Sequence, residues 1–543
     1  MAKASKSAVK KAAKVRPRKA GAARKRAAPK RMNRQNTGEP GNEAVSIRMY
    51  RGLLGDFFLL QHCRGEERFR MLIDCGVLQC IGSASSKPST YKGKDRIKAG
   101  VTDLMKETGG VIDLIVATHE HYDHLSGFIL AKEAFEGFQV KKVWMAWTED
   151  KSDSVARKYR KKKDSALTAL AALSQNPALS GTEEMQTVTN LLQFYGGADA
   201  IRSDELGVAK KTTAGKSLSG NASCASILDW LKAKAGPGNT HFLKPGQAVP
   251  WGIKDAFRAY VLGPPRDDDR LRKLDPSKGV QKEVYLVRRA EAETVKGLAA
   301  LHCGTNYSEG RIDMMPFARP HWRRYSTVRG TIQLHSRQKG HDPIVSLYGR
   351  TAGNDRIDGD WLGSTESLAL KIDGDVNNTS LALALQVTEG RILLFPADAQ
   401  VGNWESWADQ TYPESDDRGS KQLSIDKLLE RTIFYKVGHH ASHNATLRER
   451  GLELMTDTRL CAMIPVVEKT AHEQKTKSSP KGWAMPYADL YTRLGERTDG
   501  RIVRGDGDPA EERKAFKGSD FEIGYGAEFA SGDPLWVELS ISL

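Results

Sequence analysis

The stretch Thr118-His119-Glu120-His121-Tyr122-Asp123-His124 places three histidines and an aspartate within seven residues. It directly follows the apolar run Val111-Ile112-Asp113-Leu114-Ile115-Val116-Ala117, which is rich in β-branched side chains. A run of this composition predicts a strand that is buried on both faces. We therefore expect the histidines to lie in the loop at the carboxyl end of that strand, where open α/β sheets place their chemistry.

These side chains are suited to binding a metal ion. Imidazole together with carboxylate suits Zn²⁺, and it also accepts Mn²⁺ or Fe²⁺. His119 and His121 can face one ion, while Asp123 and His124 turn toward a second position about 3.5–4 Å away, the usual spacing of two-metal sites. The alternative is a polar loop that is rich in histidine by chance. The stretch predicts a centre for one or two Zn²⁺ ions, with Mn²⁺ as the alternative metal.

The order His119-Glu120-His121-Tyr122-Asp123-His124 resembles the His-x-His-x-Asp-His signature of the metallo-β-lactamase superfamily of metallo-hydrolases. The resemblance implies an α/β fold, the αββα sandwich, with a metal site at one edge of two packed sheets. It also implies that His119, His121, Asp123 and His124 are metal ligands. The resemblance covers about residues 45–505.

The segment before this motif is also similar to the family. Short alternating runs near residues 46–50, 57–60 and 69–73 predict strands that form hairpins, and the last run leads into Asp74-Cys75-Gly76. This order matches the opening hairpins of the family. The resemblance implies that Asp74 is the acid that supports a ligating histidine through the nitrogen that does not bind metal.

Two further predicted strands, over residues 377–385 and 391–395, lead to Asp398. In the family, an aspartate at this place bridges both metals, and the resemblance gives Asp398 that role. A carboxylate suits it because each of its oxygens can face one cation. The alternative is an acid that caps a helix or lies in a surface turn.

The last motif follows a predicted strand over residues 432–437. It reads His439-His440-Ala441-Ser442-His443 and is closest to the His-His-Gly-Ser variant of the family. That variant belongs to the hydrolase domain of bacterial DNA-uptake channel proteins and to their stand-alone soluble relatives, which also carry an Asn-x-x-Ser-Leu pattern like Asn377–Leu381. The resemblance implies that His439 is a metal ligand and that His440 is a catalytic histidine. It also implies supporting polar side chains around them: Asn377, Ser380, Ser442 and His443. The choice between His439 and His440 as the ligand stays open.

One family element is missing from the sequence. Family members carry another ligating histidine between the first motif and the bridging aspartate, usually followed by a small residue and Pro-Gly, and nothing here matches it. Asn377 stands near that place and is one replacement. The histidines of the intervening segment are the others: His302, His321, His335 and His341. The position that holds His119 and His121 is therefore expected to bind metal more weakly.

Charge and composition divide the chain into regions. Residues 1–36 hold 14 Lys and Arg and no acid, so of the net charge of +16 only +2 belongs to the rest. We expect residues 1–44 to form a disordered basic tail that contacts nucleic acid or another polyanion, the alternative being a solubilising tail. Residues 45–543 should form the hydrolase domain, with a helical insertion at about 148–237 and a loop-rich segment at about 266–360.

The composition also bears on location. Six cysteines are scattered singly with no CxxC pair, which is typical of reduced thiols. No run of about 18 apolar residues predicts a membrane helix, and the basic start lacks the apolar segment of a secretory signal. We expect a cytoplasmic protein that does not enter membranes.

Together these patterns predict a hydrolase that activates water with a metal. Asp123 would orient the water and His440 would stabilise the leaving group. Because this fold serves several chemistries, the substrate stays open. A phosphodiesterase or nuclease is the first expectation, a hydrolase of a small ester, lactone or lactam is the second, and a metal-bearing nucleic-acid-binding or regulatory module without turnover is the third.

Overall fold

The computed structural model of the chain describes residues 43–78, 93–177, 182–205, 222–273, 325–328, 331–334, 358–387, 390–416, 419–474, 481–529 and 532–543. Contacts divide the chain into two units, residues 1–40 and 41–543, and all described residues belong to the second. Its first strand begins at Glu43, two residues before the expected boundary. The tail, most of the loop-rich segment and four histidines named above lie outside the described residues: His302, His321, His335 and His341.

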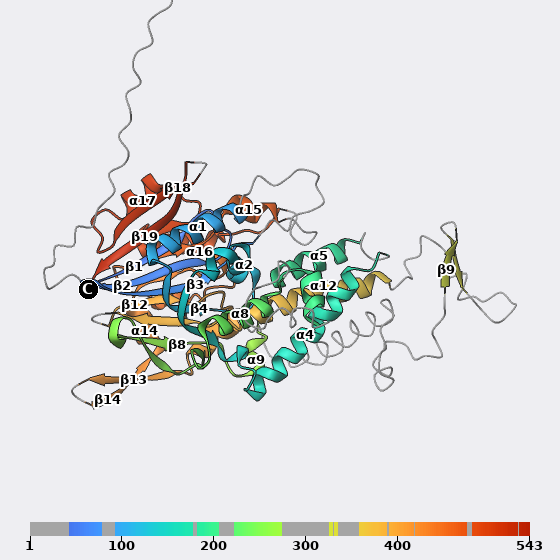
Figure 1. Cartoon of the computed structure of the whole chain (residues 1–543), viewed down its shortest axis with the longest axis horizontal. Helices are drawn as coiled ribbons and strands as arrows, with labels where there is room; N and C mark the ends of the chain where they lie inside the picture. Colours follow the sequence, from blue (N-terminus) through green and yellow to red (C-terminus); the bar gives the residue numbers. More distant parts are fainter. Residues whose placement is uncertain are drawn as a thin grey trace, which may run out of the picture. The chain divides into compact units, whose positions relative to one another are not determined.

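The chain is a mixed α/β protein with two large sheets (Figure 1). The first sheet has the order β18 (Glu522–Glu528), β19 (Pro534–Ser542), β1 (Glu43–Tyr50), β2 (Phe57–Arg64), β3 (Glu67–Cys75), β4 (Val111–Ala117), β5 (Gln139–Ala146) and β6 (Thr240–Leu243). Its strands pair antiparallel from β18 to β3 and parallel from β3 to β6. The first and last strands of this unit are therefore neighbours.

The second sheet has the order β17 (Ile502–Arg504), β16 (Cys461–Ile464), β15 (Thr432–Lys436), β12 (Ile392–Phe395), β11 (Leu383–Gln386), β8 (Phe257–Val261) and β7 (Ala248–Trp251). Its strands are parallel from β17 to β12 and antiparallel from β12 to β7. The inner faces of both sheets share one hydrophobic core. Within it, the rings of Phe58 on β2 and Phe395 on β12 meet edge to face at 6.0 Å.

Helices cover the other face of the first sheet. They are α1 (Gly93–Thr108), α2 (Tyr122–Leu130), α3 (Lys132–Glu136) and α8 (Cys224–Ala235). Their apolar side chains, such as Leu104 and Phe128, pack with Leu72 and Ile115 of the sheet in a second hydrophobic cluster. The parallel strands β4 and β5 are therefore buried on both sides, as their near-continuous apolar sequences require.

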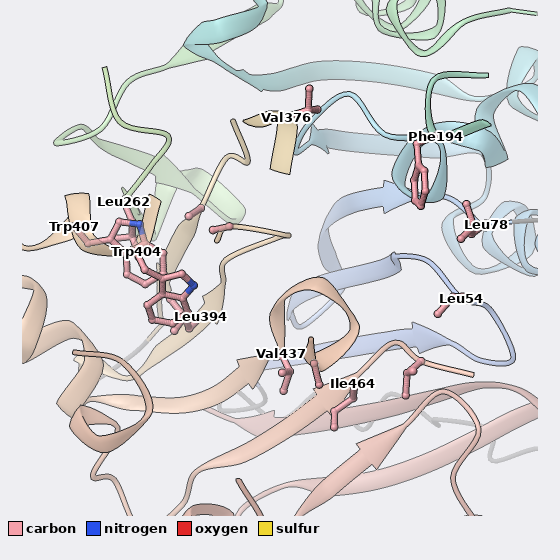
Figure 2. Close-up of a cluster of buried hydrophobic side chains, with 14 of the residues drawn as sticks. Leu54, Leu78, Phe194, Leu262, Val376, Leu394, Trp404, Trp407, Val437 and Ile464 are labelled. Carbon is pink, nitrogen blue, oxygen red and sulfur yellow. The ribbon is translucent and has the colours of Figure 1, made fainter. Parts of the chain in front are cut away.

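A third cluster lies on the outer face of the second sheet (Figure 2). Figure 2 shows Trp404 and Trp407 beside Leu262 and Leu394, and the two indole rings are 3.9 Å apart. The helices that contribute to it include α13 (Val401–Trp407), α14 (Ile425–Glu430) and α16 (Ala488–Thr498). Other described elements are β9 (Tyr325–Val328), β10 (Thr331–Leu334), β13 (Thr411–Asp416), β14 (Gly419–Ser424), α9 (Asp268–Leu271), α15 (Glu468–Glu473) and α17 (Pro509–Ala515).

The segment at 148–237 is helical where the structure describes it. It forms α4 (Ser154–Ser174), α5 (Glu183–Leu192) and α6 (Ala198–Glu205) before α8. Asp153 and Thr182 start α4 and α5 by accepting hydrogen bonds from backbone N–H groups of the first turn. The later helix α12 (Asp358–Asn377) packs against α5 and α4, as Figure 1 shows.

One local prediction beside the site was wrong. The strand expected over residues 377–385 starts only at Leu383, because Asn377 is the last residue of α12 and the N–H groups of Asn378 and Thr379 donate back to carbonyls of that helix. Helix α2 begins at Tyr122, so Asp123 lies in its first turn, where the helix dipole favours an acid.

No helix within the described ranges is both long enough and apolar enough to cross a lipid bilayer.

Candidate metal centre

The first motif lies where β4 ends and α2 begins. His119 and His121 occupy the turn, and Asp123 and His124 belong to the first turn of α2. This turn rests directly on the end of β3, since a Cβ added to Gly76 would lie 2.1 Å from the carbonyl oxygen of Asp123. Only glycine permits so close an approach of two backbones.

Asp74, at the end of β3, fixes the ring of His124. Its Oδ2 lies 2.7 Å from His124 Nδ1, and its carboxylate also accepts hydrogen bonds from the N–H and hydroxyl of Thr118 at 2.9 and 2.6 Å. A carboxylate with these contacts places the proton of neutral His124 on Nδ1. Nε2 of His124 points at Asp398 Oδ2, 3.1 Å away, and is the nitrogen that a metal could bind when the ring is neutral.

Asp398 follows β12 and is held on its other side. Its Oδ1 accepts hydrogen bonds from the N–H of His439 at 3.0 Å and from Lys436 Nζ at 3.3 Å, while its own N–H donates to Ser380 Oγ. These contacts leave Oδ2 directed at His124 with no hydrogen-bond donor. Asp398 therefore presents one free oxygen to the centre.

The last motif brings in His440. Residues His439, His440 and Ala441 have positive φ angles of 42°, 52° and 63°, a conformation that costs non-glycine residues energy and that recurs at functional sites. His440 Nδ1–H donates to the carbonyl of Pro465 at 2.7 Å, and its Nε2 lies within hydrogen-bond distance of Asp123 Oδ2, at 3.1 Å.

Four side chains thus converge, and each is at most 3% exposed: Asp123, His124, Asp398 and His440. One ligand atom from each lies within 4.8 Å of the others. Asp123 Oδ1, His124 Nε2 and Asp398 Oδ2 are buried without a hydrogen-bond partner. Because buried polar atoms are nearly always paired, lone pairs that face one another call for a cation between them. The residues fit a divalent metal.

His119 and His121 form a second pair of facing nitrogens. His119 Nδ1 lies 3.1 Å from the Thr118 hydroxyl, which donates its own proton to Asp74, so Nδ1 carries the proton. His121 Nε2 lies 3.3 Å from Tyr195 OH and 3.4 Å from Asp373 Oδ1. The remaining nitrogens, His119 Nε2 and His121 Nδ1, are 3.1 Å apart. Two lone pairs at this separation fit a second cation.

The structure places the other predicted residues as follows. Asn377 is 1% exposed, and its Oδ1 is buried without a hydrogen-bond partner. His439 contributes its N–H to Asp398, while its ring nitrogen Nδ1 lies 2.9 Å from Ser442 Oγ. The cluster of four therefore contains His440 where the sequence favoured His439, because the left-handed turn and Pro465 direct the ring of His440 inward. His443 lines the adjacent pocket.

The electrostatics are those of a cation site. Burial alone lowers the pKa of His124, but the carboxylates of Asp398, Asp56 and Asp123 outweigh it and raise the pKa well above its usual value. Burial likewise opposes ionisation of Asp398, yet His124 and Lys436 hold its pKa well below the usual range. The ionised carboxylates of the centre are thus stabilised by positive charge nearby.

The histidines of the second pair behave in the opposite way. Burial, with the neighbouring histidines, holds the pKa of His119 well below its usual value. Burial also lowers the pKa of His121 to about 4. Both rings therefore stay neutral at pH 7, which is the form that binds metal.

Sequence reasoning missed several residues around the centre. Lys436 is buried, forms an ion pair with Asp56 and contacts Asp398. A lysine inside the apolar run over residues 432–437 was a usable signal, because a charge in a buried strand needs a partner. Tyr195 and Asp373 lie on helices remote in sequence, and no motif marks them.

A pocket of about 510 Å³ opens beside the centre. Asp123, His439 and His440 line its inner end, and Asp373 lies in its wall. Burial, assisted by Asp123 and Asp398, raises the pKa of Asp373 to about 8. A molecule in this pocket would touch the centre.

No protein-family model and no curated protein matches this chain.

Proposed function

We propose that this chain is a metal-dependent hydrolase with the αββα sandwich of the metallo-β-lactamase superfamily. The convergence of Asp123, His124, Asp398 and His440 carries the proposal, because it is buried, three of these side chains have a polar atom without a hydrogen-bond partner, and the arrangement fits a divalent cation. Two sheets that share a core, with helices outside, agree with the sandwich. A bound ion would polarise the scissile bond and lower the pKa of a water that it holds to roughly 7.

The chain's own residues hold and orient this chemistry. Asp74 keeps the proton of His124 on Nδ1, and Pro465 does the same for His440. Asp398 presents one oxygen toward His124, and Lys436 balances its other oxygen. Asp123 lies both in the centre and in the pocket wall, so it is the carboxylate placed to orient the attacking water.

Zn²⁺ is the proposed metal, with Mn²⁺ as the alternative, and two positions are proposed. The first is the cluster of four, and the second is the pair His119 and His121 with Asp398 as a shared ligand. The second position has one strong ligand fewer, and the buried amide oxygen of Asn377 is the proposed substitute. We therefore expect tight binding of one ion and weaker binding of the other.

A phosphodiester is the proposed substrate, supported by the resemblance of the motif His439–Ser442 to the DNA-uptake branch. The basic tail, residues 1–36, is proposed to contact nucleic acid in a cytoplasmic setting. A small ester, lactone or lactam is the second candidate. The pocket favours it, because none of its described lining residues is a lysine or an arginine.

The test compares substrates on chelator-stripped protein reloaded with Zn²⁺ or Mn²⁺. Bis-p-nitrophenyl phosphate, single-stranded DNA, RNA and a chromogenic lactam are the substrates. We expect metal-dependent release of p-nitrophenol that His124→Ala abolishes, while His241→Ala, a change at an exposed histidine of β6, has no effect. Metal binding without turnover of any substrate would instead support a binding or regulatory module.

A further inference from the structure

The pocket beside His440 has a lining that the metal centre alone does not require. Its walls are mainly apolar and aromatic, formed by Leu191, Phe194, Leu370, Trp483, Met485 and Tyr487. These side chains come from three parts of the chain: the insertion, α12 and the segment before α16. The rings of Phe194 and Trp483 stack at 5.9 Å with an interplanar angle of 26°, which joins the insertion to that segment. The pocket is therefore built by elements added around the two sheets.

Exposure of apolar surface points to the same place. Among the described residues, the exposed large hydrophobic side chains are Val155, Leu370 and Tyr487, at 39%, 47% and 38%. Leu370 and Tyr487 both line this pocket, whereas Val155 lies at the start of α4 outside it. Exposed apolar side chains gathered at one cavity commonly mark a ligand site.

The charge of the lining restricts the ligand. No described lining residue is a lysine or an arginine. The ionisable groups present are Asp123, Asp373 and three histidines: His439, His440 and His443. A chain of nucleotides would bring a phosphate on either side of the scissile one. Phosphate contacts dominate nucleic-acid affinity, and those phosphates would meet no lysine or arginine among the described lining residues. The reacting group alone would lie next to the proposed metal.

We infer that the substrate is a small ester, foremost a phosphodiester with a single negative charge, whose non-leaving side carries a planar apolar group that fills this pocket. The inference rests on the proposed hydrolase and narrows its substrate class. The apolar walls bind the planar group, and His439 and His440 stand where the ester group must lie. The basic tail plays no part in this recognition.

The experiment uses p-nitrophenyl phosphodiesters whose second substituent is methyl, 2-naphthyl or 6-sulfo-2-naphthyl. Each turnover adds one water, breaks the P–O bond to p-nitrophenolate and leaves a phosphomonoester and a proton. The leaving group is constant, so differences report on the pocket. We expect kcat/KM for the naphthyl diester to exceed that for the methyl diester roughly 10-fold to 100-fold through KM, because its ring leaves water. The added sulfonate should cancel most of this gain.

Two variants provide a matched comparison. Leu370→Asp places a charge in the wall of the pocket, and because this side chain is 47% exposed the change should not disturb folding. It should reduce the naphthyl-to-methyl ratio about 10-fold or more, since an ionised carboxylate replaces an apolar wall. Val155→Asp makes the same chemical change at a similarly exposed residue outside the pocket and should leave the ratio unchanged.

Binding separates this inference from the proposed activity. Naphthyl methylphosphonate and methyl methylphosphonate have a methyl group on phosphorus in place of the p-nitrophenolate leaving group, and calorimetry on metal-loaded protein compares their binding. Tighter binding of the naphthyl compound that is lost in Leu370→Asp supports the pocket assignment, whether or not any diester is hydrolysed. Absence of diester hydrolysis would overturn the proposed hydrolase activity but not the pocket assignment. Equal binding of both compounds, or faster cleavage of single-stranded DNA than of the naphthyl diester, overturns the inference.

Discussion

At the scale of single residues, the centre depends on where each imidazole keeps its proton. Asp74 and the carbonyl of Pro465 each accept an N–H from a histidine, and this leaves Nε2 of His124 and His440 available. Partners of this kind orient metal ligands and raise their basicity. The sequence showed the role of Asp74 only through a family resemblance, and it contained no sign of Pro465, because a carbonyl partner leaves no mark on residue type.

The first prediction concerns Asp74→Asn. Asp74 has a φ of 52°, which asparagine tolerates, so the backbone should be retained. The amide is a weaker acceptor for the N–H of His124, and we expect metal affinity to fall about 10-fold to 100-fold. Titration of stripped protein with Zn²⁺ measures this, and the melting temperature of the metal-free variant serves as the control. Unchanged affinity would refute the role given to Asp74.

The second prediction concerns His62, a buried histidine remote from the centre. Its Nδ1 accepts the N–H of Ile253 at 3.1 Å, and its Nε2 lies 2.7 Å from Glu43 Oε1. Burial lowers the pKa of His62, although Glu43 partly opposes this. The unfolded chain therefore takes up a proton first as the pH falls through about 6.5, and the folded protein loses stability below that pH.

We expect His62→Gln to remove this dependence, because glutamine can both accept and donate without titrating. Between pH 7.5 and 5.5, the free energy of unfolding of the wild type should fall by on the order of 1 kcal/mol more than that of the variant. Urea unfolding at both pH values measures the difference, and the exposed His241→Gln should follow the wild type. Parallel pH profiles for wild type and His62→Gln would contradict the assignment.

At the scale of elements, the insertion is tied to the metal loop by buried charges. Lys163 of α4 forms an ion pair with Glu120, and Arg160 forms one with Glu149. The basic run over residues 158–163 lies on α4, and within it the side chains of Arg160 and Lys163 turn inward to these acids. Charge alone could not reveal this, because the acids that receive them lie on other elements.

The third prediction concerns the contact between β3 and α2. A Cβ on Gly76 would lie 2.1 Å from the carbonyl oxygen of Asp123, so Gly76→Ala must displace the turn that carries two of the proposed metal ligands. We expect a loss of about 3 kcal/mol in unfolding free energy and much weaker metal binding. Gly495→Ala is the matched control: nothing lies within 4 Å of its added Cβ, and α16 should gain up to about 1 kcal/mol. Similar stability of both variants would contradict the packing described.

At the scale of the whole molecule, strand periodicity and the ligand motifs predicted much of what the structure describes. The strand ends that carry His119, Asp398 and His440 were placed from apolar runs followed by ligating residues. The sequence did not predict that α12 extends to Asn377. A short segment of mixed composition can form either a helix or a strand, and here the packing of α12 against α5 favours the helix. The pocket was missed altogether, because Phe194, Leu370 and Trp483 meet only in the folded chain.

The fourth prediction separates the tail from the body. Residues 1–36 carry 14 of the positive charges, and each phosphate that they neutralise adds to the salt dependence of binding. Deleting residues 1–40 should flatten the dependence of DNA affinity on salt, as measured by fluorescence anisotropy. Hydrolysis of bis-p-nitrophenyl phosphate should stay unchanged. Equal loss of DNA binding and hydrolysis would show that the two functions are not divided in this way.

The central claim is that Asp123, His124, Asp398 and His440 hold a divalent cation. Diffraction from crystals soaked with Zn²⁺ or Mn²⁺, recorded at the absorption edge of the metal, tests it most directly. We predict an anomalous peak about 2.0–2.2 Å from His124 Nε2, His440 Nε2 and Asp398 Oδ2, and its absence in Asp398→Ala crystals. A peak found only at surface carboxylates, with the nitrogens of His124 and His440 bonded solely to protein atoms, would contradict the account.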